Sequence, residues 1–174
     1  CNNTRTAVQT IAVQDLVVPV FTFSPPDVTV SCESLPAVGT PTATDNCSPT
    51  VTVTYLGETR ENGACLDAYL LRRRWLAGDQ CGNTTTTEQV ITVRDLTPPV
   101  FSFIPDPLTV NCDAIPSVGT PIAVDNCDAA VSIVYDGETR MNGNCPNNYF
   151  LTRKWIATDN CGNSRTYTQQ IQIE

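Results

Sequence analysis

The sequence predicts an all-β protein of tandem immunoglobulin-like β-sandwich repeats, each about 80 residues long and cross-linked by disulfides. The cysteines recur 80 positions later, as Cys32 and Cys112 show (112 − 32 = 80). Half of the positions are identical when residues 15–94 are placed over residues 95–174. Short β-rich runs alternate with Pro, Gly, Asn and Asp, and no stretch has helical periodicity.

The cysteines also define the predicted domains. Cys1 aligns with Cys81, so residues 1–14 are expected to be the last strand of a preceding, truncated repeat. Residues 15–94 and 95–174 are then two full immunoglobulin-like repeats. Each begins with a Pro-rich segment (Val18-Pro19-Val20 and Thr97-Pro98-Pro99), which fixes φ and suits a stiff junction.

The strands of one repeat follow from the runs between turn residues. A first strand after the Pro-rich start is expected at 18–23, and a β-branched run predicts a second at 28–32. The third, at 40–45, ends in Asp45-Asn46, and strict alternation predicts the fourth at 51–55. A long apolar run predicts the fifth at 69–77, and a Thr-rich run the sixth at 85–93. Six short strands suit a two-sheet sandwich, and the second repeat should copy them 80 residues later.

The fifth strand carries the predicted core. Trp75 and its copy Trp155 are expected to be buried there. Alternation places Arg73, and likewise Arg153, on the same apolar face. A buried guanidinium needs a carboxylate, and Glu58, copied as Glu138, is the predicted partner. The alternative is a bulge that turns Arg73 outward, over the indole, in a cation–π contact.

Composition restricts the functional classes. Nine cysteines, no histidine and one methionine indicate an oxidising, extracellular compartment. The net charge of −8 disfavours nucleic acid and anionic membranes as partners, and no apolar run is long enough for membrane insertion by this segment. Without histidine the common catalytic triads are impossible, so no enzyme and no catalytic residues are expected.

Two intra-repeat disulfides are predicted from strand direction. If Cys32 and Cys65 share one end of the sandwich, Cys47 and Cys81 share the other, which favours the pairs Cys32–Cys65 and Cys47–Cys81. In the second repeat the same reasoning gives Cys112–Cys145 and Cys127–Cys161. An irregular 33–40 segment would instead let Cys32 reach Cys47.

Asp and Asn residues should gather at one end of each repeat, beside the incoming linker. Oxygen ligands that converge at a junction suit Ca²⁺, and apart from calcium no cofactor is expected. The alternative is that these residues only form Asx turns. The candidate calcium ligands are Asp15, Asp45, Asn46, Asp79 and Asn83 in the first repeat, and Asp95, Asp125, Asn126, Asp159 and Asn163 in the second.

The Val-x-Asp-Leu-Thr-Pro-Pro-Val-Phe segment at 93–101, together with the Asp-Asn-Cys and Cys-Gly-Asn motifs, resembles the HYR-like repeats of large secreted Bacteroidota surface proteins. Gliding-motility adhesins of the SprB type are similar. The resemblance implies an immunoglobulin-like sandwich, export by type IX secretion, and a role in adhesion or surface filaments. Departures such as Asp79-Gln80-Cys81 and Val17-Val18-Pro19 put a uniform junction geometry in doubt.

The predicted function is structural: a repeat of an extracellular stalk, filament or giant cell-surface adhesin that supplies length, rigidity and protease resistance. Its partners are neighbouring repeats of the same chain or fibre. In the first alternative the repeats are carbohydrate- or cell-binding modules, for which segments 61–67 and 141–147 would be the variable loops, with surface polysaccharide or other cells as partners. In the second alternative, residues 1–14 donate a strand to a neighbouring subunit of a polymer.

Overall fold

The chain is all-β in the computed structural model, which describes residues 1–143 and 147–174. The first repeat contains β1 (Val20–Phe23), β2 (Val28–Val30), β3 (Thr42–Thr44), β4 (Thr52–Asn62), β5 (Tyr69–Gly78) and β6 (Thr84–Val93). The second contains β7 (Val100–Phe103), β8 (Leu108–Val110), β9 (Ile122–Val124), β10 (Ser132–Asn142), β11 (Tyr149–Thr158) and β12 (Ser164–Ile173). No helix among the described residues has the length and apolarity to span a membrane.

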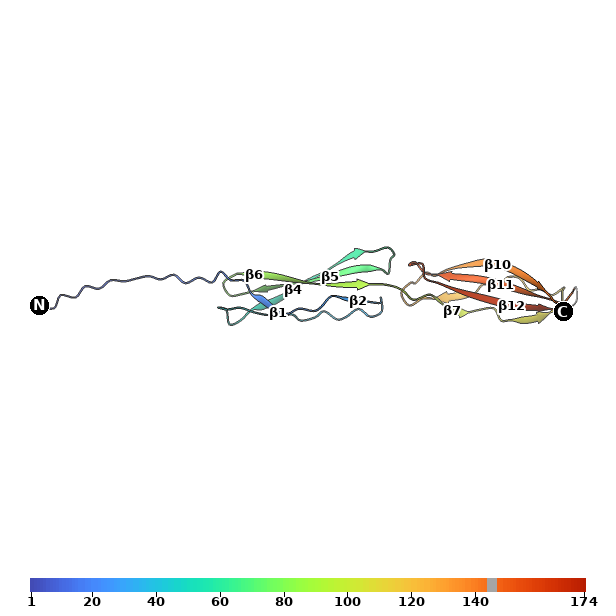
Figure 1. Cartoon of the computed structure of the whole chain (residues 1–174), viewed down its shortest axis with the longest axis horizontal. Helices are drawn as coiled ribbons and strands as arrows, with labels where there is room; N and C mark the ends of the chain where they lie inside the picture. Colours follow the sequence, from blue (N-terminus) through green and yellow to red (C-terminus); the bar gives the residue numbers. More distant parts are fainter. Residues whose placement is uncertain (144–146) are drawn as a thin grey trace. The chain divides into compact units, whose positions relative to one another are not determined.

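Each repeat has one two-stranded and one four-stranded sheet, as the predicted sandwich requires. In the first repeat these are β1-β3 and β2-β6-β5-β4, and in the second β7-β9 and β8-β12-β11-β10. The long strands β10, β11 and β12 pair antiparallel side by side (Figure 1), whereas the short β8 joins β12 in parallel. The immunoglobulin-like all-β class is therefore confirmed.

The compact units of the structure do not follow the sequence repeats. One unit comprises residues 1–26, 37–59 and 72–90, and the other comprises residues 27–36, 60–71 and 91–174. The second unit thus contains part of the first repeat together with the whole second repeat. The boundaries proposed at residues 15 and 95 stay a prediction, as does the assignment of residues 1–14, which form no strand in this chain.

The fourth strand of each repeat is longer than predicted. It was expected to end at Tyr55, but β4 runs to Asn62 and β10 to Asn142. In β10 the pairing with β11 shifts between Tyr135 and Gly137, which marks a β-bulge. Gly137 has φ of 98°, a conformation that favours glycine, so the Gly of the Gly-Glu-Thr-Arg segment lets the strand continue past its apolar part.

The alternating face of the fifth strand forms the core in both repeats. Trp75 and Trp155 are each 2% exposed, in agreement with their predicted role. The Trp155 ring contacts Tyr135 and Tyr167, with centroid distances of 5.5 and 6.1 Å. Leu151, Ile171 and Ile173 form a further buried cluster, and Leu71, Ile91 and Val93 form its counterpart in the first repeat.

The predicted arginine pairs lie within this face. Arg73 is 5% exposed, and its Nε donates to Glu58 Oε2 at 3.0 Å. Arg153 Nε donates to Glu138 Oε2 at 2.7 Å, and its Nη atoms donate to the Ser117 and Pro116 carbonyls. Cation–π contacts instead involve Arg60 over Tyr69 and Arg140 over Tyr149.

The Glu58→Gln variant tests the pair. We expect a loss of about 1 kcal/mol in the free energy of unfolding, because a buried guanidinium loses its charged partner, whereas the 42% exposure of the Glu58 side chain moderates the cost. Glu88→Gln is the matched control, since the Arg72–Glu88 pair is exposed on both sides and should change stability by less than about 0.5 kcal/mol. Equal effects in urea unfolding would contradict a special role for Glu58.

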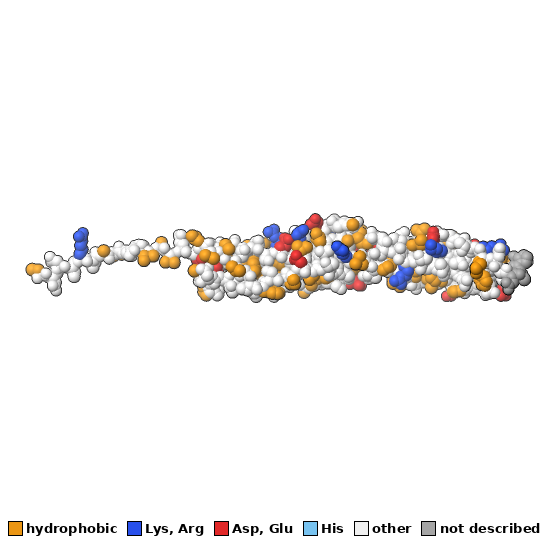
Figure 2. All heavy atoms as spheres, viewed as in Figure 1, with side chains coloured by type: hydrophobic (Ala, Val, Ile, Leu, Met, Phe, Trp, Pro, Cys, Tyr) orange, Lys and Arg blue, Asp and Glu red, His pale blue; other side chains and the backbone are white. Residues whose placement is uncertain are grey.

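The surface lacks a large field of one sign on the face shown in Figure 2. Charged side chains there occur in small mixed groups among apolar and neutral polar atoms. Arg72 and Arg74 both pair with Glu88, at 2.9 and 3.9 Å.

Candidate functional site

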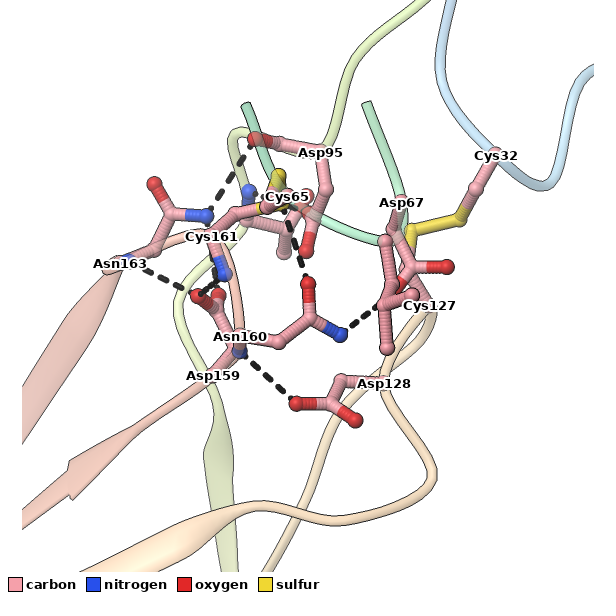
Figure 3. The surroundings of a disulfide bond; sticks show 12 residues. Cys32, Cys65, Asp67, Asp95, Cys127, Asp128, Asp159, Asn160, Cys161 and Asn163 are labelled. Atoms are coloured by element: carbon pink, nitrogen blue, oxygen red, sulfur yellow. Dashed lines mark hydrogen bonds between the residues drawn. A yellow bond between two sulfur atoms is a disulfide. The ribbon is translucent and has the colours of Figure 1, made fainter. Parts of the chain in front are cut away.

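Two disulfides join the first repeat to the second. Cys32, which follows β2, bonds Cys127, which follows β9, with a Cα–Cα distance of 5.9 Å. Cys65, between β4 and β5, bonds Cys161, between β11 and β12, with a Cα–Cα distance of 5.1 Å. All four cysteines belong to the second compact unit, so this repeat junction is one structural body (Figure 3).

The predicted intra-repeat pairing is therefore wrong. Cys32 does not bond Cys65, and Cys127 does not bond Cys161, because each of them bonds a cysteine of the other repeat. The reasoning from strand direction placed Cys32 and Cys65 at the same end, and both do lie at this junction. It failed because it considered only bonds within one repeat. At this junction Cys32 and Cys65 of the first repeat lie next to Cys127 and Cys161 of the second.

The other cysteines that the structure describes are free thiols. Cys1, Cys47, Cys81 and Cys112 are free and exposed, so the predicted Cys47–Cys81 bond is absent from the structure. The predicted partner of Cys112, Cys145, lies outside the described residues. The Asp15 carboxylate raises the pKa of the Cys47 thiol, with further contributions from burial, Asp45 and Cys81.

Hydrogen bonds reinforce the junction beside the disulfides. Asn160 Nδ2 donates across it to Asp67 Oδ2 at 2.6 Å, and the Asn160 backbone NH donates to Asp128 Oδ2 at 2.8 Å (Figure 3). Asn126 Nδ2 lies 3.1 Å from Cys127 Sγ and 3.7 Å from Cys32 Sγ. The same loops thus supply both covalent and polar contacts between the repeats.

The Asp residues predicted as calcium ligands form Asx turns. In each, Oδ1 accepts from a backbone NH two residues on, and in most cases from a second NH further along the chain. Asp125 Oδ1, for example, accepts from the NH groups of Cys127 and Asp128, and Asp159 Oδ1 from those of Cys161 and Asn163. The same arrangement occurs at Asp15, Asp45, Asp79 and Asp95.

The turns leave other carboxylate oxygens free. The Oδ2 atoms of Asp15, Asp45, Asp95 and Asp125 are buried and have no hydrogen-bond partner. One ligand atom from each of Asp15, Asp45 and Asp79 lies within 4.8 Å of the others. Asp95, Asp125 and Cys127 form the corresponding group in the second repeat.

Electrostatics at Asp95 reflect this crowding. Burial raises the pKa of the Asp95 carboxyl, the hydrogen bond from the Thr97 NH opposes that rise, and the charges of Asp125, Asp159 and Asp67 add to it. Asp95 is only 5% exposed. An ionised Asp95 is therefore costly at this place unless a cation compensates it.

The predicted Asn residues have other partners. Asn46 and Asn126 donate to the sulfur atoms of Cys47 and Cys127, so their amides face the cysteines. Asn83 Nδ2 donates to Asp79 Oδ2 and to the Asp15 carbonyl, and Asn163 does the same in the second repeat. Asn83 and Asn163 thus tie the start of each repeat to the turn before its last strand.

Sequence reasoning missed Asp67 and Asp128 as contributors to the junction. Asp67 and Asp128 have no Asp at the matching position of the other repeat, where Asn147 and Ser48 stand, so the repeat pattern gave them no weight. Asn160 replaces Gln80 of the first repeat in the Asp-Asn-Cys-Gly motif. The change from Gln80 to Asn160 was the usable sequence signal that this loop has a different role in the second repeat.

An open cleft lies beside the Cys65–Cys161 disulfide. Its volume is about 410 Å³, and apolar side chains such as Ala64, Leu70 and Leu96 line it. Leu96 is 74% exposed. Polar residues also border the cleft, among them Arg94, Asp95 and Asn163.

A comparison with known families found one match, within the second repeat. Residues 103–173 match the family of HYR-like domains with 4 cysteines. The matched segment contains β8 to β12 and three of the cysteines that the structure describes, Cys112, Cys127 and Cys161. A comparison with curated proteins found no match.

Solved structures with similar folds are cadherin and immunoglobulin arrays. Drosophila N-cadherin EC1-4 is 11% identical, with a TM-score of 0.40, over 90% of this chain and 49% of that chain. The protocadherin gammaB7 EC3-6 cis-dimer is 13% identical, with a TM-score of 0.41, over 91% and 52%. Tandem Ig repeats of Dlar are 14% identical, with a TM-score of 0.27, over 90% and 97%. The chain spans about half the length of the two cadherin structures.

The sheets and the HYR-like match together describe the class of fold. The chain consists of immunoglobulin-like β-sandwich repeats, and part of the second repeat is similar to HYR-like domains. The second repeat carries the HYR-like match itself, and the first repeat shares its strand order and half of its residues.

Proposed function

We propose that this chain is a structural segment of an extracellular stalk, filament or giant cell-surface adhesin in which successive repeats are locked by paired disulfides. The observation that carries the proposal is the double cross-link of Cys32 with Cys127 and Cys65 with Cys161. Two covalent links between different loops restrict both separation and rotation of adjoining repeats. A single peptide linker restricts neither, so the cross-links supply rigidity and protease resistance.

The free cysteines extend the proposal beyond one junction. Cys47 and Cys81 occupy the positions of Cys127 and Cys161, and Cys112 that of Cys32 (32 + 80 = 112). They would form the same bonds with repeats on either side. Each bond forms when two thiols lose two protons and two electrons, which a disulfide-bearing thiol oxidoreductase accepts as it is reduced to a dithiol.

The finer identity rests on the motifs. The Thr-Pro-Pro-Val-Phe, Asp-Asn-Cys and Cys-Gly-Asn segments support a surface protein of the SprB type from Bacteroidota, exported by type IX secretion and active in gliding motility or adhesion. The acidic composition makes separate stalks repel each other, so they resist lateral clumping. The proposed partners are therefore the neighbouring repeats of the same chain or fibre.

Two structural features argue against the alternatives. Segment 61–67, a candidate adhesive loop, contributes Cys65 and Asp67 to the junction. Segment 141–147 includes residues 144–146, which lie outside the described residues. Strand donation requires an acceptor without its last strand, whereas β12 already pairs with β8 and β11 in the second repeat.

Peptide mapping without reduction tests the proposed function. We expect a Cys32–Cys127 peptide and a Cys65–Cys161 peptide, each of which separates into its two halves after reduction. Alkylation before digestion of the isolated 174-residue chain should label Cys47, Cys81 and Cys112, because their thiols are free in the structure. A Cys32–Cys65 or Cys127–Cys161 peptide as the main product would overturn the inter-repeat cross-link.

A further inference from the structure

The buried carboxylates at the start of each repeat lack a counter-charge. Asp95 is 95% buried (5% exposed), and its Oδ2 has no partner although the atom is inaccessible to solvent. Asp125 Oδ2 is in the same state, and carboxylate oxygens of the two residues lie within 4.8 Å. Two unpaired like charges at this distance disfavour the fold unless something neutralises them.

The first repeat contains an independent copy of the arrangement. Asp15 Oδ2 and Asp45 Oδ2 are again buried without a partner, and Asp79 joins them within 4.8 Å. The copy belongs to the other compact unit. The same unsatisfied oxygens thus arise twice, from two separately folded sets of residues.

No ion pair among the described residues joins a Lys or Arg side chain to Asp15, Asp45, Asp95 or Asp125. The ion pairs of the described residues join Arg72, Arg73, Arg74, Arg153 and Lys154 to other carboxylates. Backbone NH groups already occupy Oδ1 of Asp95 and Asp125. The turns therefore fix the two side chains with one oxygen of each directed away from its backbone donors.

The donor set selects a hard divalent cation. The ligands are carboxylate oxygens, and the nearby Cys127 sulfur is bonded to Cys32, so it is no thiolate ligand for zinc. Ca²⁺ accepts irregular oxygen sites completed by carbonyls and water, whereas Mg²⁺ demands near-ideal octahedral geometry. The irregular loop geometry therefore favours calcium.

We propose that each repeat binds one Ca²⁺ between the Asp at its start and the Asp of its Asp-Asn-Cys motif, which are Asp15 with Asp45 and Asp95 with Asp125. Asp79 contributes to the first site. Asn46 and Asn126 are not ligands, because their amides face sulfur. The proposed calcium ligands are thus a smaller set than the sequence predicted.

The ion would couple the linker to the disulfides. Asp95 follows the last strand of the first repeat, and Asp125 lies two residues before Cys127, which bonds Cys32. Figure 3 shows Asp95 beside the other disulfide, Cys65–Cys161, with Asp159 and Asn163 around it. Calcium would thus hold the start of a repeat against the loop that carries a cross-link, independently of whether the full protein is a stalk.

The test is calcium titration of the oxidised full chain after chelation, by calorimetry and by thermal unfolding. We expect binding of one Ca²⁺ per repeat and a rise in melting temperature at up to about 10 mM Ca²⁺, above the ~1 mM Kd of weak extracellular modules. Mg²⁺ at the same concentration should raise the melting temperature less.

Variants separate binding from folding. In Asp125→Asn the amide oxygen still accepts the turn hydrogen bonds, so the fold should persist, one Ca²⁺ should be lost, and the calcium-free form should melt no lower than the parent. Asp45→Asn with Asp125→Asn should lose all calcium response, whereas the exposed control Asp113→Asn should keep it. No calcium response in the parent chain, or an undiminished one in the double variant, would overturn the proposal.

Discussion

Replacing both Cys65 and Cys161 by Ser should lower the free energy of unfolding of the second compact unit by about 2–5 kcal/mol. The bond closes a loop with a sequence separation of 96, and long loops gain most from a cross-link that restricts the unfolded chain. Replacing both Cys32 and Cys127 by Ser should have a comparable effect, because these two cysteines are 95 residues apart in the sequence. Calorimetric melting without reductant measures both.

Two controls accompany the disulfide variants. Cys112→Ser removes a free, exposed thiol and should leave the melting temperature unchanged. Reductant should lower the melting temperature of the parent chain but not that of the variant lacking all four bonded cysteines. A parent chain indifferent to reductant would show that the cross-links do not stabilise the junction.

Trp155→Ala should destabilise the second repeat by about 3–5 kcal/mol. The indole is 2% exposed and contacts Tyr135 and Tyr167, so its loss removes apolar burial and leaves a cavity that the paired β10 and β11 cannot close. Urea unfolding followed by circular dichroism gives the free energy. The size of this loss follows from the rigidity of the sheet around the ring.

Matched substitutions define the expected contrast. Trp155→Phe should cost less than the alanine variant because it keeps an aromatic ring in the same place. Leu96→Ala removes a side chain of a residue that is 74% exposed, and it should change stability by less than about 0.5 kcal/mol. A Trp155→Ala loss as small as that of Leu96→Ala would contradict a core role for the tryptophan.

Local sequence patterns were sufficient where neighbouring residues set the structure. Alternation along residues 69–77 placed Arg73 and Trp75 on the buried face, because side chains of a strand alternate with period two whatever their surroundings. The need to neutralise a buried guanidinium then singled out Glu58. The same logic stopped short at Tyr55, because Gly57 has a positive φ of 101°, which interrupts the period-two pattern although β4 continues to Asn62.

The candidate cation sites were predicted in part. The Asp residues do converge, since strand direction brings the Asp-Asn-Cys turn and the start of the repeat to one end. The sequence offered calcium ligation and Asx turns as alternatives, whereas the structure uses Oδ1 for the turns and leaves Oδ2 of several carboxylates free. Which oxygen of a carboxylate is occupied depends on side-chain geometry, which no spacing rule contains.

The sequence by itself determined the repeat, the all-β class, the buried tryptophan face and the ends at which the cysteines lie. Only the tertiary structure decided which cysteines pair, because Cys32, Cys65, Cys127 and Cys161 meet where two repeats adjoin. Periodicity makes equivalent cysteines of different repeats indistinguishable in one dimension. A disulfide needs Cα atoms about 5.5 Å apart, and that distance is set by how successive sandwiches pack at their junction.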